Sequence, residues 1–267
     1  MIAAFTGWND AGSAASALIS HLATQWRAEK MHEMNPEEYH DFQVNRPVVM
    51  RGADGKRQIH WPTTTFWVAR LPHRTYVLVD GIEPSFKWRQ YCEDILDIAA
   101  DMKCEAIITI GALLADVPHT RPFPLTATSD DSEIAEALQL DISDYEGPVG
   151  IVGVLQSAAT ASGIDSIALW VAVPHYLAEP PSPKATLALV TRLEELIDDS
   201  IDLGTLPDEA AQWDKEVAEM VEEDEDVMSY VKLLEEASDT ANMPEASGEA
   251  IAQEFESWLR KNDVHPE

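Results

Sequence analysis

The stretch Ala106-Ile107-Ile108-Thr109-Ile110-Gly111 decides the fold class of this chain. It is apolar at both odd and even positions, and such a run is typical of a central parallel strand that helices cover on both faces. A second run of this kind is Ile167-Ala168-Leu169-Trp170-Val171-Ala172-Val173. Two such strands separated by helical patterns predict an α/β domain with a mainly parallel sheet.

Strands and amphipathic helices alternate on both sides of these two runs. Helices are expected from about Gly12, Trp88, Asp131, Val152 and Pro183, because apolar residues then recur at helical spacing. Ser182 supplies the expected N-cap of the last of these, and Pro183 its first turn. The remaining strands are expected at 1–6, 65–69 and 76–80, with a hairpin in the same sheet that joins 47–51 to 57–61.

Composition bounds the class of protein. The chain has 267 residues, of which 45% are hydrophobic, and its 48 acidic and 18 basic side chains give a formal charge of −30. This length corresponds to one large domain, or one domain with an appendage, whose core needs neither disulfides nor a structural metal. Such acidity argues against binding to nucleic acid or to an anionic membrane surface.

The cysteines and the apolar runs indicate a cytoplasmic protein. Cys92 and Cys104 are the only cysteines and lack the spacing of a zinc site, so we expect reduced thiols, no metal and no cofactor. The first six residues are apolar but have no basic region before them, so no signal peptide is expected. No apolar run approaches the roughly 20 residues that cross a bilayer.

The last quarter of the chain differs in composition from the rest. Residues 207–267 carry 19 acidic and 4 basic side chains, a net charge of −15, so we divide the chain into an α/β domain at 1–206 and an acidic helical extension at 207–267. Helical stripes that must pack on this chain's own core or on a neighbouring subunit are Trp213, Val217, Met220 and Val221; Val227, Tyr230, Val231 and Leu234; and Ile251, Phe255, Trp258 and Leu259.

Polar clusters follow four of the expected strands. Because the carboxyl ends of parallel strands meet at one edge of a sheet, where ligand crevices form, these residues are expected to be neighbours. They are the candidate ligand-binding or interface residues: Trp8, Asn9, Asp10, Asp80, Glu83, His119, Thr120, Arg121, His175 and Tyr176.

Each cluster has two interpretations. The segment from Gly7 to Gly12 can present backbone N–H groups to a small anion, but we favour a structural role in which Asn9 or Asp10 caps the next helix and Trp8 packs under a loop. The His119 and Arg121 side chains can bind a carboxylate or phosphate. For Arg121 we favour a bridge to loop carbonyls or to a neighbouring subunit, and His175-Tyr176 is interpreted in the same way.

Other motifs carry little chemistry. The sequence has no phosphate-binding loop of the G-x-x-x-x-G-K-[ST] type, no G-x-S-x-G, no H-E-x-x-H and no EF-hand loop. The glycines of 147–153 lack the dinucleotide-binding arrangement, and the acidic run 222–226 is interpreted as a solvated helix end rather than a cation site. No catalytic residue is therefore assigned.

Several long motifs resemble the PAC2 family (proteasome assembly chaperone 2-like), in its actinobacterial branch. They include Gly7-Trp8-Asn9-Asp10-Ala11-Gly12 and Asp116-Val117-Pro118-His119-Thr120-Arg121-Pro122. The resemblance covers residues 1 to about 200 and again 255–260, with further matching segments at 39–47, 61–64, 111–115, 145–148, 172–176 and 180–186. It implies a three-layer α/β/α fold with a mixed, mainly parallel sheet similar to the purine nucleoside phosphorylase type, and self-association as a trimer.

The resemblance also implies a function. Some family members are proteasome assembly chaperones, and archaeal relatives dock on proteasome rings through a C-terminal hydrophobic-Tyr-any tripeptide, which the ending Asp263-Val264-His265-Pro266-Glu267 does not match. We therefore expect a non-enzymatic assembly chaperone or protein-binding factor with partners such as proteasome subunits. The alternative is a binder of, or enzyme acting on, a nucleoside, phosphate or carboxylate at the sheet edge.

Overall fold

The computed structural model describes residues 1–52, 55–143 and 145–241. Its main elements are β1 (Ile2–Thr6), α1 (Ala14–Gln25), β2 (Glu29–Glu33), β3 (Val48–Arg51), β4 (Arg57–His60), β5 (Thr65–Arg70), β6 (Thr75–Ile82), α2 (Trp88–Asp101), β7 (Ala106–Ala115), β8 (Leu125–Thr128), α3 (Ser132–Leu138), α4 (Ile151–Ala161), β9 (Asp165–Pro174), α5 (Pro183–Ile197), α6 (Leu206–Glu222) and α7 (Glu225–Ala241).

A seven-stranded mixed sheet forms the centre of the molecule, with the strand order β2-β5-β6-β1-β7-β9-β8. The four inner strands β6, β1, β7 and β9 run parallel, whereas β5, β2 and β8 are antiparallel to their neighbours. The predicted mainly parallel α/β sheet is thus confirmed. The carboxyl ends of its four parallel strands lie at one edge.

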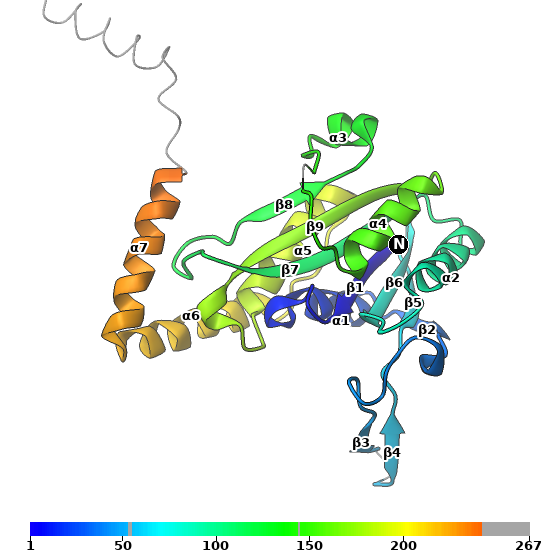
Figure 1. Ribbon diagram of the computed structural model, residues 1–267, viewed down its shortest axis with the longest axis horizontal. Helices are drawn as coiled ribbons and strands as arrows, with labels where there is room; N and C mark the ends of the chain where they lie inside the picture. Colours follow the sequence, from blue (N-terminus) through cyan, green and yellow to red (C-terminus); the bar gives the residue numbers. More distant parts are fainter. Residues whose placement is uncertain (53–54, 144, 242–267) are drawn as a thin grey trace, which may run out of the picture.

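Helices cover both faces of this sheet (Figure 1). On one face α1 and α5 bury alternate strand residues such as Ile108, Ile110 and Leu169. On the other face α2 and α4 pack over Phe5 and Ile107. Since neighbouring residues of β1 and β7 point into different cores, each of these strands has to be largely apolar, and Thr6 and Thr109 are the polar residues in their sequences.

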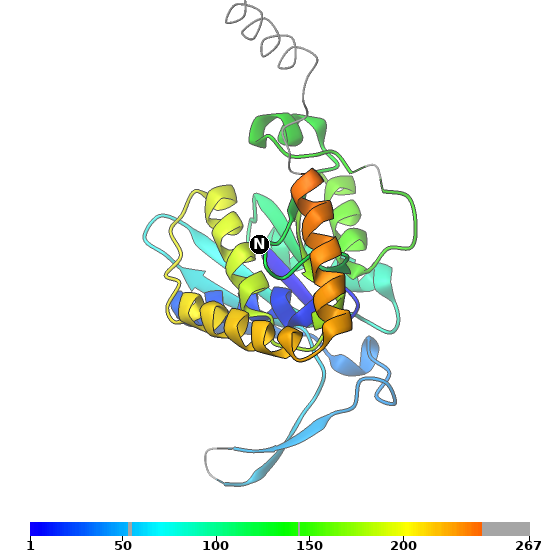
Figure 2. The same cartoon turned by 90° about the vertical axis from the view of Figure 1, so that its left-hand side faces the viewer.

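The predicted hairpin forms, but it does not continue the sheet. β3 and β4 pair only with each other and project from the body of the protein (Figure 2). The place next to β5 is taken by β2, whose five residues are all exposed. The sequence Glu-Lys-Met-His-Glu of β2 lacks the alternation of a half-buried strand, so the sequence did not reveal it.

The described part of the acidic extension packs on its own chain. Leu206 and Trp213 of α6 reach the core beside α1 and α5. Val217 and Val221 of α6 meet Val231 of α7 over Leu177 in a small separate cluster. The predicted stripe is wrong at Met220, which is 49% exposed. The third predicted stripe, at 251–259, lies outside the described residues, and the division at residue 206 stays a prediction.

The start of α5 also differs from expectation. Pro183 occupies the first turn, but the Ser182 side chain makes no capping hydrogen bond, and its hydroxyl is buried without a partner among the described residues. Close packing explains this, because a Cβ on Gly12 would lie 2.6 Å from the Cβ of Ser182, whose backbone N–H donates to the Gly12 carbonyl over 2.9 Å. None of the helices in the described residues is long and apolar enough to span a membrane.

A substitution in β7 tests the close packing of Gly111 against the Trp170 ring. A Cβ on Gly111 would lie 2.4 Å from the Trp170 ring on β9, so Gly111→Ala is expected to destabilise the fold by about 1–3 kcal/mol. Urea unfolding measures the loss. Combining it with Trp170→Leu should cost less than the sum of the two single changes, and strict additivity would contradict this contact.

Candidate functional site

The loop after β1 is fixed to the sheet edge by its own polar residues. Asn9 is only 3% exposed, its carbonyl accepts the Ala112 N–H over 2.8 Å, and its side-chain amide donates to the Phe5 carbonyl over 3.4 Å. The Asp10 carboxylate accepts the N–H of Ala15 over 2.8 Å and the hydroxyl of Ser16 over 2.6 Å, at the start of α1. Asp10 therefore caps α1, in agreement with the structural interpretation.

A carboxylate also accepts a hydrogen bond from a backbone N–H group at the start of α4. Glu83, which follows β6, accepts the Ile151 N–H over 3.0 Å. Asn9 lies alongside, since a Cβ on Gly150 would be 2.1 Å from its side-chain oxygen. The chain's own carboxylate thus occupies the helix N-terminus, where an external anion would otherwise bind.

Asp80 is the exception among these carboxylates. It lies near the end of β6, opposite Ala4 of β1, and no described residue donates a hydrogen bond to its side chain. Burial, and secondly the charge of Asp10, raise its pKa to about 6. Burial also raises the pKa of Asp10, although the hydrogen bonds from Ser16 and Ala15 oppose this. The pair thus binds protons far more readily than exposed aspartates do.

Trp8 does not pack under a loop, because its side chain is 97% exposed. Its neighbours Asn9 and Asp10 both point inward, and Gly7 turns the chain with a φ of 137°. Leu113, which follows Ala112 in β7, is 42% exposed. Trp8 and Leu113 are therefore both exposed to solvent, and each is next in sequence to a residue of the hydrogen bond between Asn9 and Ala112, which fixes the backbone here.

The polar residues after β7 and β9 form a second group. The Tyr176 hydroxyl lies 2.8 Å from the backbone nitrogen and 2.9 Å from Nδ1 of His119. His175 Nδ1 lies 3.2 Å from Asp116, which also accepts the Tyr230 hydroxyl of α7 over 3.2 Å. Burial, and secondly the Lys184 charge, lower the pKa of His119, so its ring is neutral at pH 7.

The Arg121 guanidinium makes its hydrogen bonds within this second group. Its guanidinium donates to both carboxylate oxygens of Asp239 over 2.8 and 2.7 Å and to Glu235 over 3.2 Å, while Thr120 donates to Glu235. These hydrogen bonds lower the pKa of Asp239. Arg121 thus has a structural role, but its partners are carboxylates of α7 rather than the predicted loop carbonyls.

The structure therefore divides the ten predicted residues into two groups at the same edge. No hydrogen bond or ion pair between described residues joins the group around Asn9 to the group around His119. A single crevice lined by all of them stays a prediction. In the described ranges no three His, Cys, Asp or Glu side chains are placed to hold a metal ion.

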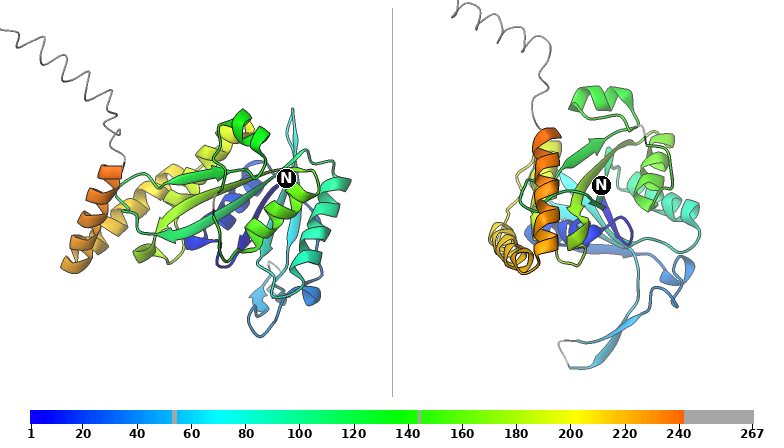
Figure 3. Two further views of the ribbon diagram at one scale, coloured as in Figure 1. Left: turned by 45° about the horizontal axis from the view of Figure 1, so that its top comes forward. Right: turned by 60° about the vertical axis from the view of Figure 1, so that its left-hand side comes forward.

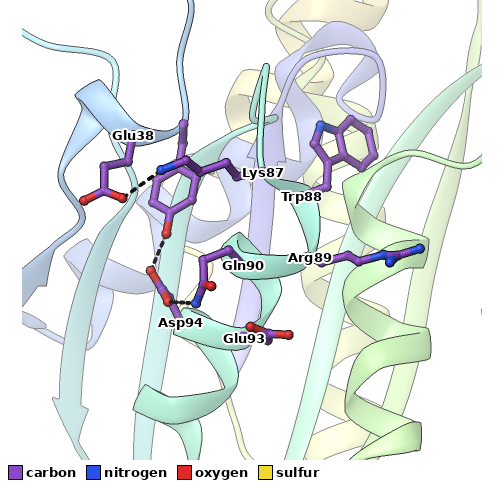
Figure 4. Close-up of a pocket in the computed structure, with 8 residues that line it drawn as sticks. Glu38, Lys87, Trp88, Arg89, Gln90, Glu93 and Asp94 are labelled. Carbon is purple, nitrogen blue, oxygen red and sulfur yellow. Dashed lines mark hydrogen bonds and ion pairs between the residues drawn. The ribbon is translucent and has the colours of Figure 1, made fainter.

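A surface pocket of about 740 Å³ lies away from all ten residues, beside the start of α2 (Figure 4). Several of its polar groups pair with one another, since Lys87 is 3.2 Å from Glu38, and Asp94 accepts from both Gln90, over 2.9 Å, and Tyr39. Burial, and secondly Asp94, raise the pKa of Tyr39, which stays protonated. Apart from the motif at 39–47, no sequence pattern predicted this pocket. It is lined by Glu38, Tyr39, Lys87, Trp88, Arg89, Gln90, Glu93 and Asp94.

The chain is thus a three-layer α/β protein. Most polar residues at the carboxyl edge of its sheet bond to the chain's own helices and loops, and apolar side chains at this edge are exposed to solvent. The sequence model of the PAC2 family matches residues 4–221, so the chain belongs to the PAC2 family. Among curated proteins nothing matches significantly.

Solved structures agree with this assignment. The PAC2 family protein of Streptomyces avermitilis is 47% identical, with a TM-score of 0.82 over 86% of this chain and 98% of that one. The proteasome-assembly chaperone homologue of Mycobacterium tuberculosis is 42% identical, with a TM-score of 0.78 and the same coverage. An archaeal proteasome activator of Pyrococcus furiosus shares the fold at 19% identity, with a TM-score of 0.65 over 83% of this chain and 92% of that one.

The raised pKa of Asp80 predicts a specific pH dependence. Since about 6 is above the roughly 3.9 of an unfolded aspartate, folding favours the protonated form, and the stability from this group falls as pH rises between these values. Asp80→Asn should flatten this decline and raise the free energy of unfolding at pH 7 by on the order of 1 kcal/mol. Chemical unfolding from pH 4 to 8 measures it. Asp97→Asn on the exposed side of α2 is the control and should leave the profile unchanged.

The Arg121 contacts predict how α7 is held. Arg121→Met removes both carboxylate partnerships, so amide hydrogens of α7 should exchange faster while those of β7 and β9 stay protected. Hydrogen-exchange mass spectrometry measures this. Arg192→Met, which breaks an ion pair within α5, is the control, and unchanged exchange in α7 of the Arg121 variant would contradict the assignment.

Proposed function

We propose that this chain is a proteasome-related assembly chaperone or protein-binding factor rather than an enzyme. Its likeness to a mycobacterial proteasome-assembly chaperone homologue supports the class of partner. The observation on which the proposal rests is Trp8, exposed on an anchored loop. Cytoplasmic location and self-association are part of the same proposal.

Trp8 has the properties of an anchor residue at a protein interface. A tryptophan buries a large area at small cost in conformational entropy, and such residues dominate many binding energies. Because Asn9 and Asp10 already fix the backbone, little ordering remains to be done when a partner covers the indole. The exposed apolar side chains of Trp8 and Leu113 at this sheet edge support a protein partner more than a small polar ligand.

The acidic helices supply the electrostatic part of the surface. Residues 206–241, which form α6 and α7, contain 13 acidic and 2 basic side chains. Charge of one sign over two adjacent helices attracts a basic or amphipathic partner and speeds its encounter. The proposal therefore includes a partner with a basic patch, bound more weakly as salt is raised.

Affinity purification of the tagged full-length chain from cells of its own organism tests the proposal. Proteasome subunits should stay bound at low salt, and Trp8→Ala should lower their recovery by roughly tenfold or more. Leu138→Ala is the control, because Leu138 is also an exposed apolar residue but lies on α3, which follows β8 at the opposite edge of the sheet. Absence of proteasome subunits, or equal recovery with the Trp8 variant, would overturn it.

A second candidate function rests on Asp80. A largely buried carboxyl group without a hydrogen-bond donor among the described residues, and with a pKa near 6, is suited to a small ligand that donates hydrogen bonds, such as a nucleoside. Thermal unfolding of the full chain with nucleosides, phosphates and carboxylates separates the two functions, since a ligand that binds the folded state raises the midpoint. An increase that Asp80→Asn abolishes would favour this alternative.

A further inference from the structure

The hairpin arm, defined as residues 44–61, is largely exposed over its described residues, 44–52 and 55–61. Every residue of β3 and β4 is exposed, and the arm projects from the body as a two-stranded ribbon (Figures 1 and 2). The large apolar residues Val48, Val49, Met50 and Ile59 are between 47% and 59% exposed. An isolated hairpin is only marginally stable in water, so an exposed one with this composition indicates a surface that a partner covers.

The strand register gives the arm one distinctive face. Val49 lies opposite Ile59, and the next pair on the same face is Arg51 opposite Arg57. Like charges directly opposite each other destabilise a hairpin. Neither arginine has a carboxylate partner among the described residues, although Arg51 donates to the Gly55 carbonyl over 3.1 Å. This face combines an apolar pair with two adjacent positive charges, and an acidic surface with exposed apolar side chains complements it.

Such a surface is present on the chain itself. The arm holds 4 basic residues and 1 acidic residue, for a net charge of +3, whereas residues 206–241 have a net charge of −11. Met220 on α6 is exposed between acidic side chains, close in sequence to Glu216 and Glu219. Leu233 on α7 is exposed in the same manner.

The positions of the two surfaces determine which molecule makes the contact. The arm leaves one end of the body, and α6 and α7 lie at the opposite end (Figures 1 and 3). The arm therefore cannot reach the acidic helices of its own chain. We propose that the apolar and basic face of the arm docks on the acidic face of α6 in a second copy of this chain, an inference that rests on the self-association included in the proposed function. The contact is head-to-tail, so it closes into a ring or extends as a filament.

Charge complementarity favours a second copy as the occupant. Two copies of a chain with a charge of −30 repel each other unless basic groups lie at their contact, and the arm places four of the chain's 18 basic residues in one projecting segment. Both complementary surfaces occur in every molecule, so each copy can donate one arm and accept one.

Sedimentation velocity of the full chain, over a range of protein and salt concentrations, tests the proposal. The wild-type chain should self-associate at low salt and dissociate as salt is raised. The double substitution Arg51→Gln and Arg57→Gln should weaken association by roughly tenfold or more. The matched control is Gln58→Glu with His60→Glu, which changes the charge by the same amount on the opposite face of the arm and should weaken association much less.

A charge-swap experiment identifies the docking surface. A chain with Arg51→Glu and Arg57→Glu should not self-associate, but it should form mixed assemblies with a chain carrying Glu216→Lys and Glu219→Lys, because the opposite charges then face each other again. Circular dichroism of each variant should match the wild-type spectrum, since all four side chains are exposed.

Three outcomes would overturn the proposal. They are a wild-type chain that stays monomeric at low salt, an arginine variant that associates as strongly as the wild type, and a charge-swapped pair that does not assemble. If the wild-type chain is monomeric and binds a different acidic protein that the arginine variant no longer binds, the partner of the arm is not a second copy of this chain.

Discussion

Burial of the inner parallel strands on both faces is the constraint on which the rest of the structure depends. β1 and β7 place alternate side chains in two separate cores, so α1 and α5 must cover one face and α2 and α4 the other. This arrangement brings four strand ends to one edge and makes the loops that follow them neighbours of helix N-termini. Asp10 and Glu83 are then needed to satisfy the first N–H groups of α1 and α4.

The sequence predicted the features that depend on burial of the strands on both faces. The runs at 106–111 and 167–173 belong to β7 and β9, because their composition reports burial on both sides directly. It did not predict β2, which is fully exposed, or the separation of the hairpin from the sheet, because neither depends on a buried pattern. The prediction that Trp8 packs under a loop was wrong, because the side chains of Asn9 and Asp10 occupy the buried side of this segment and leave the indole exposed.

The candidate site was partly predictable for the same reason. Topology alone placed the clusters after β1, β6, β7 and β9 at a common edge. The partners of Arg121 could not be predicted, since Glu235 and Asp239 lie more than a hundred residues further along the chain on a helix whose docking depends on a small apolar cluster. The sequence pattern shows that α7 needs a surface, but not which one.

The central position of β1 affects how the protein is made. Ile2 pairs with Leu78 on one side and with Ile108 on the other, so β1 acquires its neighbours only after long stretches of later chain have been synthesised. Pairings so distant in sequence slow folding and leave apolar strands open to association in the meantime. In the nascent chain β1 therefore stays without its sheet partners until both β6 and β7 have emerged.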